Sequence, residues 1–573
     1  MRATLLLAAA LALAGCQQAP VAPMSNASPA PQPAPAPKGS AWHQFVEGFV
    51  ESDFREEPQR AVRAGRHEFD GQVEDVTPAA FDRRIARLHA DRTRATGFDA
   101  ASLTPDERFE RDYLLWVIDE ELFGLEVARQ PYRNPAFYAS AMSPDVYLDR
   151  EYAPLPQRLA AFVKYERALP TLTRQVRENL QLPLQKTYIQ VGHIIIGGLA
   201  NHFEKNVPDI FAPVTDEKLK AELKDSNAGA IAALKELDAW LQEQLPNATQ
   251  EFALGAETFR RMLHDTEGVD IPLPVLWEMG QRDVERNIAA LKDACARVIP
   301  GVPIRGCMER VQGRKPPEGP VRAATSQLGE LKKFIEQAHV VTIPSTEDVV
   351  VQEAPPHQRF NPAYISTPGP YEKGLSSIFY VAPPDPAWSP EEQRAYIPDR
   401  PNLMFYSIHE VWPGRFLQHL YAKRAPSLVG RVYRSNAFTE GWAHYAEELM
   451  VEDGFSRGDP ALSVAQVSNA LVRDVRYLCA IGMHGADMTV TQCEAMFRER
   501  AFQDPASARQ QAARGTIDPA YLNNTLGKLL IRELRDDWTA KHGGRASWQA
   551  FHDKLLSYGS PPLPLVRKAM MAE

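Results

Sequence analysis

The chain has 573 residues, of which 73 are acidic and 64 are basic, so its formal net charge is −9. Hydrophobic residues make up 44% and charged residues 24%, which is close to the globular average and excludes a chain that is disordered throughout. The acidic excess argues against nucleic acid as the partner, because nucleic-acid binding needs a basic face.

The first 16 residues have the pattern of an export signal. Arg2 precedes an apolar stretch, Ala3–Ala14, of about a dozen residues, whereas roughly 20 are needed to span a bilayer. The stretch ends in LAGC, which resembles the lipobox of bacterial lipoproteins. This resemblance implies that Cys16 is acylated and attaches the exported protein to a membrane, and Gln17, which is not Asp, implies the outer membrane, facing the periplasm. The alternative is an ordinary signal with a chance cysteine.

Residues 17–40 are predicted to form a tether. Seven of the 47 prolines lie between Pro20 and Pro37, mostly alternating with alanine. Such a sequence favours extended polyproline II and cannot pack a core. We therefore expect folding to begin near Ala41 and the body to extend over 41–573.

The body is predicted to be mainly helical, with a small sheet. Apolar residues recur every three to four positions in five segments, which predicts helices. Segments rich in β-branched residues follow between about 339 and 385 and predict three or four strands beside the active cleft. Motif-bearing helices are then expected over about 400–535. The five helical segments are Phe109–Asp119, Arg158–Leu180, Asp216–Leu245, Pro274–Val298 and Val321–Ala338, and the candidate strands begin at 339, 348, 364 and 377.

Four cysteines remain after Cys16, in two pairs that are close in sequence. An exported protein is in an oxidising compartment, where disulfides form. Cys295 and Cys307 flank a segment with Pro and Gly and could close a hairpin, and Cys479 with Cys493 is the weaker candidate pair. Neither pair has the spacing of a zinc knuckle or a CxxC redox site.

Four of the fourteen histidines fall between residues 409 and 484. His409 and Glu410 are adjacent in apolar sequence, and burying two titratable groups together is costly without a purpose. In zinc hydrolases a histidine binds the metal and a neighbouring glutamate takes a proton from metal-bound water. Pro413 cannot continue the helical hydrogen-bond ladder, so we expect His409 and Glu410 at the end of a helix.

A second stretch, AFTEGWAHYAEEL, carries a polar stripe. Glu440, His444 and Glu447 or Glu448 stand at i, i+4 and i+7 or i+8, so they share one helix face. Such a stripe is either a solvated surface or a site. Gly441 and Trp442 in its first turn indicate close packing.

Together these stretches resemble the bacterial domain of unknown function 885 family, whose hallmarks are HExxPGH and a downstream EGWAxYxE. The chain carries HEVWPG and EGWAHYAE, followed by matching segments at 473–484 and 518–528. The family is similar to the gluzincin metallopeptidases. The resemblance implies a large helical, gluzincin-like peptidase fold with a cleft, zinc as the cofactor and hydrolysis of short peptides.

The resemblance also assigns roles by position. His409 would be a zinc ligand, Glu410 the general base and Glu440 a further ligand. Three other residues match positions near the expected site, where they would orient ligands or stabilise an oxyanion: His444, Tyr445 and His484.

The chain departs from the family pattern at two positions. Arg415 stands where the family has histidine, and a guanidinium cannot bind zinc. Asn524 replaces a tyrosine, for which the nearby Tyr521 could substitute. Arg415, Tyr521 and Asn524 are all expected to line the substrate site. The missing ligand could come from His419, His444 or His484. Alternatively, Arg415 takes the place of the metal and pairs with Glu440 and Glu410.

Two functions remain after these departures. The first is a lipid-anchored, metallopeptidase-like hydrolase with an altered zinc site, and the survival of Glu410 with two ligands favours it. The second is an inactive relative that binds peptides or an envelope partner. A purely structural lipoprotein would leave His409, Glu410 and Glu440 without a role.

Overall fold

The computed structural model describes residues 39–572, apart from 356–357, 360 and 385–386. The predicted signal peptide, Cys16 and residues 17–38 of the predicted tether lie outside the described residues. The fold below is that of the described part of residues 35–573. Helix α1 begins at Ala41, where the sequence predicts the folded body to begin.

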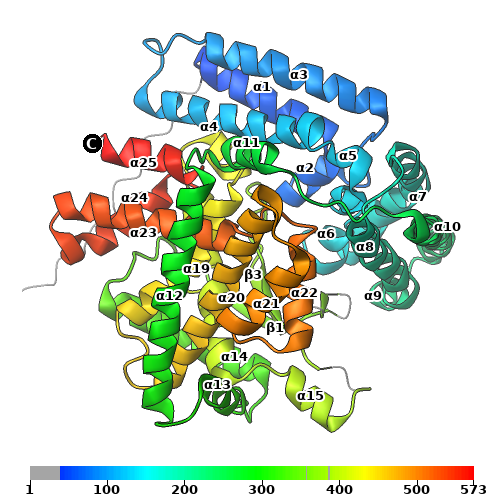
Figure 1. The fold of residues 1–573 in the computed structure, drawn as a ribbon. Coiled ribbons are helices and arrows are strands. Elements are labelled where there is room, and N and C mark those ends of the chain that lie inside the picture. Colours follow the sequence, from blue (N-terminus) through cyan, green and yellow to red (C-terminus); the bar gives the residue numbers. More distant parts are fainter. Residues whose placement is uncertain (1–38, 356–357, 360, 385–386, 573) are drawn as a thin grey trace, which may run out of the picture. The chain divides into compact units, whose positions relative to one another are not determined.

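Helices dominate the chain up to Ala338 (Figure 1). Each of the five predicted helical segments lies on a helix of the structure, at α4, α7, α10, α12 and α14. Local sequence sets several boundaries; Thr104, for example, caps α4 through a reciprocal capping box with Glu107. In chain order the helices are α1 (Ala41–Glu56), α2 (Pro58–Ala64), α3 (Pro78–Gly97), α4 (Pro105–Leu122), α5 (Gln130–Arg133), α6 (Asp145–Asp149), α7 (Leu155–Asn179), α8 (Lys186–Lys205), α9 (Val207–Phe211), α10 (Glu217–Glu243), α11 (Ala256–Glu267), α12 (Leu273–Val298), α13 (Ile304–Gln312) and α14 (Pro320–Ala338).

The sheet has three strands in the order β1-β3-β2: β1 (Val349–Glu353), β2 (Ala363–Ser366) and β3 (Ser377–Val381). Strand β3 is parallel to β1 and antiparallel to β2, and Phe379 pairs with both Val351 and Ile365. Strand β2 contacts α16 (Arg400–Glu410), so the sheet lies beside the predicted motif helix.

The candidate strand at 339–344 is wrong, because this segment is not a strand in the structure. Val340 and Val341 are buried, but the backbone around them bonds to side chains of α24 (Trp548–Ser557). The Val340 carbonyl accepts from His552, and the Thr342 amide donates to Asp553. Backbone hydrogen-bonding groups of this β-branched segment are thus paired with side chains of a helix and not with a neighbouring strand.

Helices resume at Pro390, as predicted, and continue to the end of the described chain. Further to α16 and α24, they are α15 (Pro390–Tyr396), α17 (Arg415–Ala422), α18 (Leu428–Val432), α19 (Asn436–Glu452), α20 (Pro460–Gly485), α21 (Val490–Arg500), α22 (Pro505–Gly515), α23 (Asn523–Lys541) and α25 (Leu563–Met571). None of the described helices combines the length and apolar character that crossing a bilayer requires.

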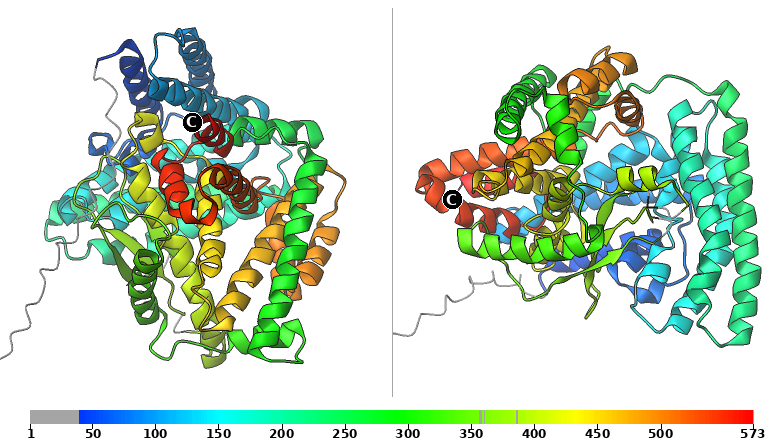
Figure 2. Two further views of the ribbon diagram at one scale, coloured as in Figure 1. Left: turned by 90° about the vertical axis from the view of Figure 1, so that its left-hand side faces the viewer. Right: turned by 90° about the horizontal axis from the view of Figure 1, so that it is seen from below.

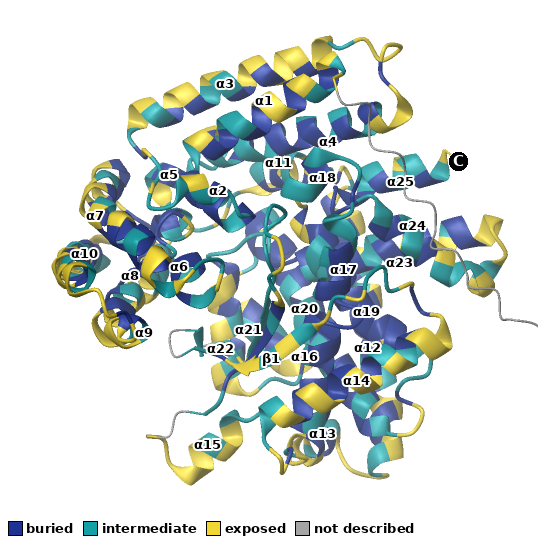
Figure 3. Cartoon of the chain, turned by 180° about the vertical axis from the view of Figure 1, so that it is seen from behind, coloured by how far each residue is buried: buried dark blue, intermediate teal, exposed yellow. Residues whose placement is uncertain are grey.

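Three large hydrophobic cores hold the described elements together, and a small fourth cluster lies around Tyr380 of β3. One lies among α1–α10, where α10 packs side by side with α7 and α8 (Figure 2). A second joins α14, β3, α16, α17, α19, α24 and α25, and a third joins α11–α13 with α20–α22. Helices α19 and α20 are mostly buried, whereas one face of α3 and of α10 is exposed (Figure 3). The motif-bearing helices are therefore interior elements.

Both candidate disulfides are present. Cys295 at the end of α12 is bonded to Cys307 in α13, and Cys479 in α20 is bonded to Cys493 in α21. Each bond links two consecutive helices across a short connection.

Candidate functional site

The turn between α16 and α17 places the first motif. His409 and Glu410 are the last two residues of α16, as the position of Pro413 predicts, and both are buried. Gly414 then approaches α16 so closely that a Cβ on it would lie 2.0 Å from the carbonyl oxygen of His409. Only glycine fits there. Arg415 begins α17 immediately after this turn and so faces the end of α16.

The second motif is placed by the contact between α19 and α23. A Cβ on Gly441 would lie 2.4 Å from the Cα of Gly527, so the two backbones touch. This contact brings Asn524, at the start of α23, to Glu440 in α19. The Asn524 amide donates a hydrogen bond of 2.9 Å to Oε2 of Glu440.

Arg415 forms ion pairs with both carboxylates of the predicted site. Its Nη2 donates to Oε1 of Glu440, and its Nε lies 3.8 Å from Oε2 of Glu410. Neither that Nε nor that Oε2 has a hydrogen bond among the described residues, so the two atoms face each other. Desolvation opposes ionisation here, but Arg415 and His409 together outweigh it and hold the pKa of Glu440 well below its usual range. The carboxylates likewise raise the pKa of Arg415 against desolvation.

His409 is held by a second carboxylate and an arginine. Its Nδ1 lies 2.7 Å from Oε1 of Glu447, and its Nε2 lies 3.8 Å from Oε2 of Glu440. Arg473 in α20 donates to the other oxygen of Glu447 at 3.0 Å. Burial opposes protonation of the imidazole, but Glu440 and Glu447 raise its pKa. The imidazole is therefore fixed on its Nδ1 side and faces Glu440 with its Nε2.

These residues do not fit the three convergent protein ligands that a catalytic zinc needs. His409 and Glu440 approach each other, but Arg415 occupies one Glu440 oxygen and Asn524 the other. Among the residues that the structure describes, one group has three or more potential ligand atoms within 4.8 Å of one another, and it lies elsewhere: Asp53, Glu57 and Glu121. Arg60 and Arg84 each form ion pairs with members of that group.

Two further histidines that could supply the missing ligand do not complete the site. His444 is fully buried, its Nδ1 lies 3.6 Å from Oε2 of Glu447, and neither ring nitrogen has a hydrogen bond among the described residues. Burial, and then the nearby Lys528, lower its pKa to about 3. His419 lies one turn beyond Arg415 on α17, and burial, and then Arg434, lower its pKa to about 3. Both are therefore neutral at physiological pH.

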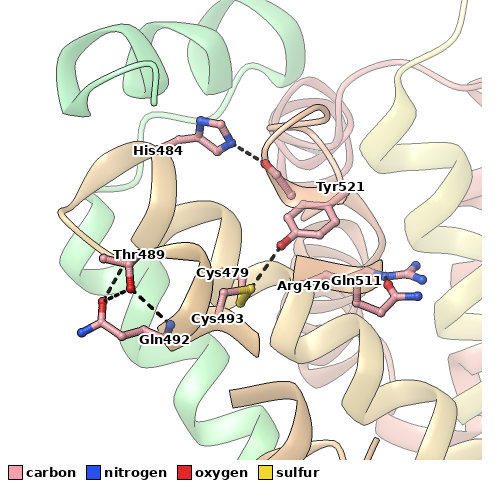
Figure 4. The surroundings of a disulfide bond; sticks show 9 residues. Arg476, Cys479, His484, Thr489, Gln492, Cys493, Gln511 and Tyr521 are labelled. Atoms are coloured by element: carbon pink, nitrogen blue, oxygen red, sulfur yellow. Dashed lines mark hydrogen bonds between the residues drawn. A yellow bond between two sulfur atoms is a disulfide. The ribbon is translucent and has the colours of Figure 1, made fainter. Parts of the chain in front are cut away.

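Three other predicted residues have their hydrogen-bond partners elsewhere. The Tyr445 hydroxyl bonds to His552 at 2.8 Å and accepts from Arg535 at 3.1 Å. His484 bonds to the carbonyl of Gly515 at 2.7 Å, and the Tyr521 hydroxyl lies 3.9 Å from Sγ of Cys493 (Figure 4). Tyr445 thus supports α24, while His484 and Tyr521 lie around the second disulfide.

The structure adds two members to the site. Glu447 and Arg473 fix His409, although neither carried a role in the sequence-based assignment. A signal for Glu447 was present, because it stands on the same helix face as Glu440 at i+7. Arg473 lies within a family-like segment, but its approach to Glu447 depends on how α20 packs against α16 and α19, which spacing does not reveal.

A cavity of about 970 Å³ lies beside the site. Its wall comes from α2–α4, α11, the connection between α18 and α19, and the segment before α23. Asn523 and Arg434 line it; Asn523 precedes Asn524, and Arg434 is close enough to Arg415 for the two charges to repel. The cavity wall therefore includes the sequence neighbour of Asn524 and an arginine close to Arg415. The cavity has the size that accommodates small ligands.

Comparison with known proteins identifies the family. Two solved structures have the same fold: a "putative lipoprotein of unknown function" from Shewanella oneidensis (TM-score 0.77, 23% identity, 93% of this chain and 100% of that one) and a "putative lipoprotein" from Colwellia psychrerythraea (TM-score 0.78, 15% identity, 93% and 99%). No curated protein matches the chain. Residues 58–570 match the family described as bacterial protein of unknown function (DUF885), and the chain belongs to that family.

Proposed function

We propose that this protein is a lipid-anchored envelope protein that binds short peptides without zinc, on a scaffold related to gluzincin-type peptidases. In this proposal the Arg415 guanidinium is a permanent cation in the place where a peptidase would hold its metal. The observation that carries the proposal is the ion pair of Arg415 with Glu440, with Glu410 facing the same guanidinium.

The charge balance at the site supports a role for Arg415 as a fixed cation. A guanidinium is always protonated and presents several donors in one plane, which suits two carboxylates. The negative charge of Glu440 is thereby paired with Arg415 at the position where a metal ligand would be. Glu410 then has no metal-bound water to activate. A peptide carbonyl next to Arg415 would be polarised less than by a divalent ion, so binding is favoured over hydrolysis.

Envelope attachment is supported by two observations outside the site. The LAGC sequence at Cys16 resembles a lipobox, and both structural neighbours are described as putative lipoproteins. Gln17 is the reason for proposing the outer membrane with the body facing the periplasm.

A peptide-retention experiment tests the proposal. The full-length protein in detergent is mixed with an equimolar tripeptide library, ultrafiltered, and the retained and cleaved peptides are counted by mass spectrometry. We expect intact peptides to be retained equally with EDTA and with added zinc, and R415Q to reduce retention while R282Q, at an exposed position on α12, leaves it unchanged.

Two outcomes would contradict the proposal. Zinc-dependent cleavage that H409A abolishes would identify a metallopeptidase. Failure of the wild-type protein to retain any tripeptide would exclude peptide binding.

A further inference from the structure

Arg434 lies in the wall of the cavity and has no ion-pair partner among the residues that the structure describes. It lies on the short connection between α18 and α19, lines the cavity and has an exposed side chain. Within the described part of the chain, its guanidinium forms no hydrogen bond and no ion pair. Arg415, by contrast, forms ion pairs with Glu440 and Glu410. Arg434 is therefore the group of this pair whose charge is available to a ligand.

The backbone on both sides of Arg434 is fixed. Tyr433 is buried, and its hydroxyl donates to Asp53 at 2.9 Å. Ser435 is buried as well, and its hydroxyl bonds to Glu267 at 2.5 Å. With both neighbours anchored in the protein, the connection presents Arg434 to the cavity in a defined place, which reduces the entropy that a ligand must overcome.

The surroundings of Arg434 favour an anion. The surrounding protein atoms and the nearby Arg415 charge lower the pKa of Arg434, although Tyr113 acts in the opposite direction. His419 also has cations near it, because Arg434, Lys423 and Arg150 all contribute to its low pKa after burial. A bound carboxylate would offset the repulsion between the guanidinium groups of Arg434 and Arg415 and pair with the Arg434 charge.

We propose that Arg434 binds the C-terminal carboxylate of a peptide held in this cavity, an inference that rests on the peptide-binding function proposed above. The planar guanidinium matches a carboxylate in a bidentate arrangement. A monovalent carboxylate is favoured over a phosphate dianion, because Glu120 and Glu121 line the same cavity. Apolar side chains in the wall supply contacts for the peptide's own side chains: Val117, Phe123, Leu125 and Met262.

Matched peptide libraries test this role. The tripeptide library is prepared once as free acids and once as C-terminal amides, and retention of the two is compared on the full-length wild-type protein. We expect the acids to be retained about tenfold or more above the amides, the size of effect that a charge-assisted pair gives. In R434Q this ratio should fall to about one, whereas R434K should keep part of it.

R55Q is the matched control, because Arg55 also lines the cavity and is exposed. It removes the same charge from the wall but should leave the acid-to-amide ratio unchanged. Equal retention of acids and amides by the wild-type protein, or an equal loss of the ratio in R55Q and R434Q, would overturn the role of Arg434 while peptide binding stands. Competition by inorganic phosphate without any acid preference would assign the site to phosphate and overturn it too. No retention of either library would instead contradict the proposed function itself.

Discussion

At the scale of single residues, Arg415 has no lone pair to give to a metal, unlike the histidine that the resemblance leads us to expect at this position. Replacing it with histidine should convert the site towards a zinc site, because His409 and Glu440 already approach each other at 3.8 Å. We expect R415H to bind about one zinc per chain after dialysis, measured by elemental analysis, while the wild-type protein does not.

The control for this substitution is R415Q, which removes the same charge and adds no metal ligand. A gain of zinc by R415H that exceeds the gain by R415Q would show that the remaining ligands converge. Equal zinc contents in the two variants would mean that they do not, and the peptidase-like ancestry of the site would lose its support.

His67 is expected to make a pH-dependent contribution to stability. Its Nδ1 lies 3.0 Å from Asp70 and its Nε2 lies 3.2 Å from Glu372, and the ring stacks on Tyr152 at 3.7 Å. Burial opposes protonation, but the two carboxylates raise the pKa of His67 from 6.5 to about 9. The raised value means that the stabilisation is complete below pH 6.5 and is lost as the pH rises through 9.

The free energy of unfolding should therefore fall by about 1–3 kcal/mol between these two pH values because of His67. Urea denaturation at pH 6.5 and pH 9.5 measures the change, and H67Q should remove this part of the pH dependence. An unchanged slope in H67Q would assign the pH dependence to other groups.

The predicted residues that the structure brings together at the site are those fixed by motif spacing. His409 with Glu410, and Arg415 just after Gly414, are adjacent in the chain, so one turn places them together. Tyr445 follows Glu440 by five positions, which is about 140° around the helix from it, so it faces another element. His484 and Tyr521 were assigned from resemblance alone, and their place depends on packing.

At the scale of elements, the backbone contact between α19 and α23 determines the site geometry. G441A would place a Cβ 2.4 Å from the Cα of Gly527, and no flexible side chain there can move away. We expect a loss of about 3 kcal/mol or more in unfolding free energy and weaker peptide retention, because Glu440 and Asn524 must separate.

The matched control is G329A on the exposed face of α14, where an added Cβ meets nothing within 4 Å. It should stabilise the protein by about 0.5–1 kcal/mol, because alanine is the better helix former. Thermal denaturation of both variants separates these effects. A G441A protein as stable as wild type would contradict the close contact of the two helices.

Helices were the predictable elements and the sheet was less so. The periodicity of long segments such as α7 and α12 is strong, because each has one buried face along its whole length. A short β-branched segment has too few residues to show a comparable periodicity. The segment at 339–344 therefore looked like a strand, although its polar backbone groups are satisfied by α24.

At the scale of the whole molecule, the cavity is assembled from distant parts of the chain. Tyr433, beside Arg434, belongs to the same hydrophobic core as α1–α10, and its carbonyl accepts from Tyr113 of α4 at 2.6 Å. The motif region in the last third of the chain thus obtains one wall of its cavity from the first third. The spacing of residues in the sequence does not indicate which distant segments come into contact, so the cavity could not be predicted.

The proposed membrane attachment involves the part of the chain that precedes this folded body. Because Cys16 ends the LAGC sequence that resembles a lipobox, we expect attachment to depend on Cys16. One acyl chain holds a protein only marginally, whereas several on one residue hold it stably. C16S should therefore abolish incorporation of radiolabelled palmitate and move the protein from the membrane pellet to the soluble fraction. Q17D keeps the cysteine, so it should keep the label and move the protein to the inner-membrane fraction. Labelled C16S protein in the pellet would show that attachment has another basis.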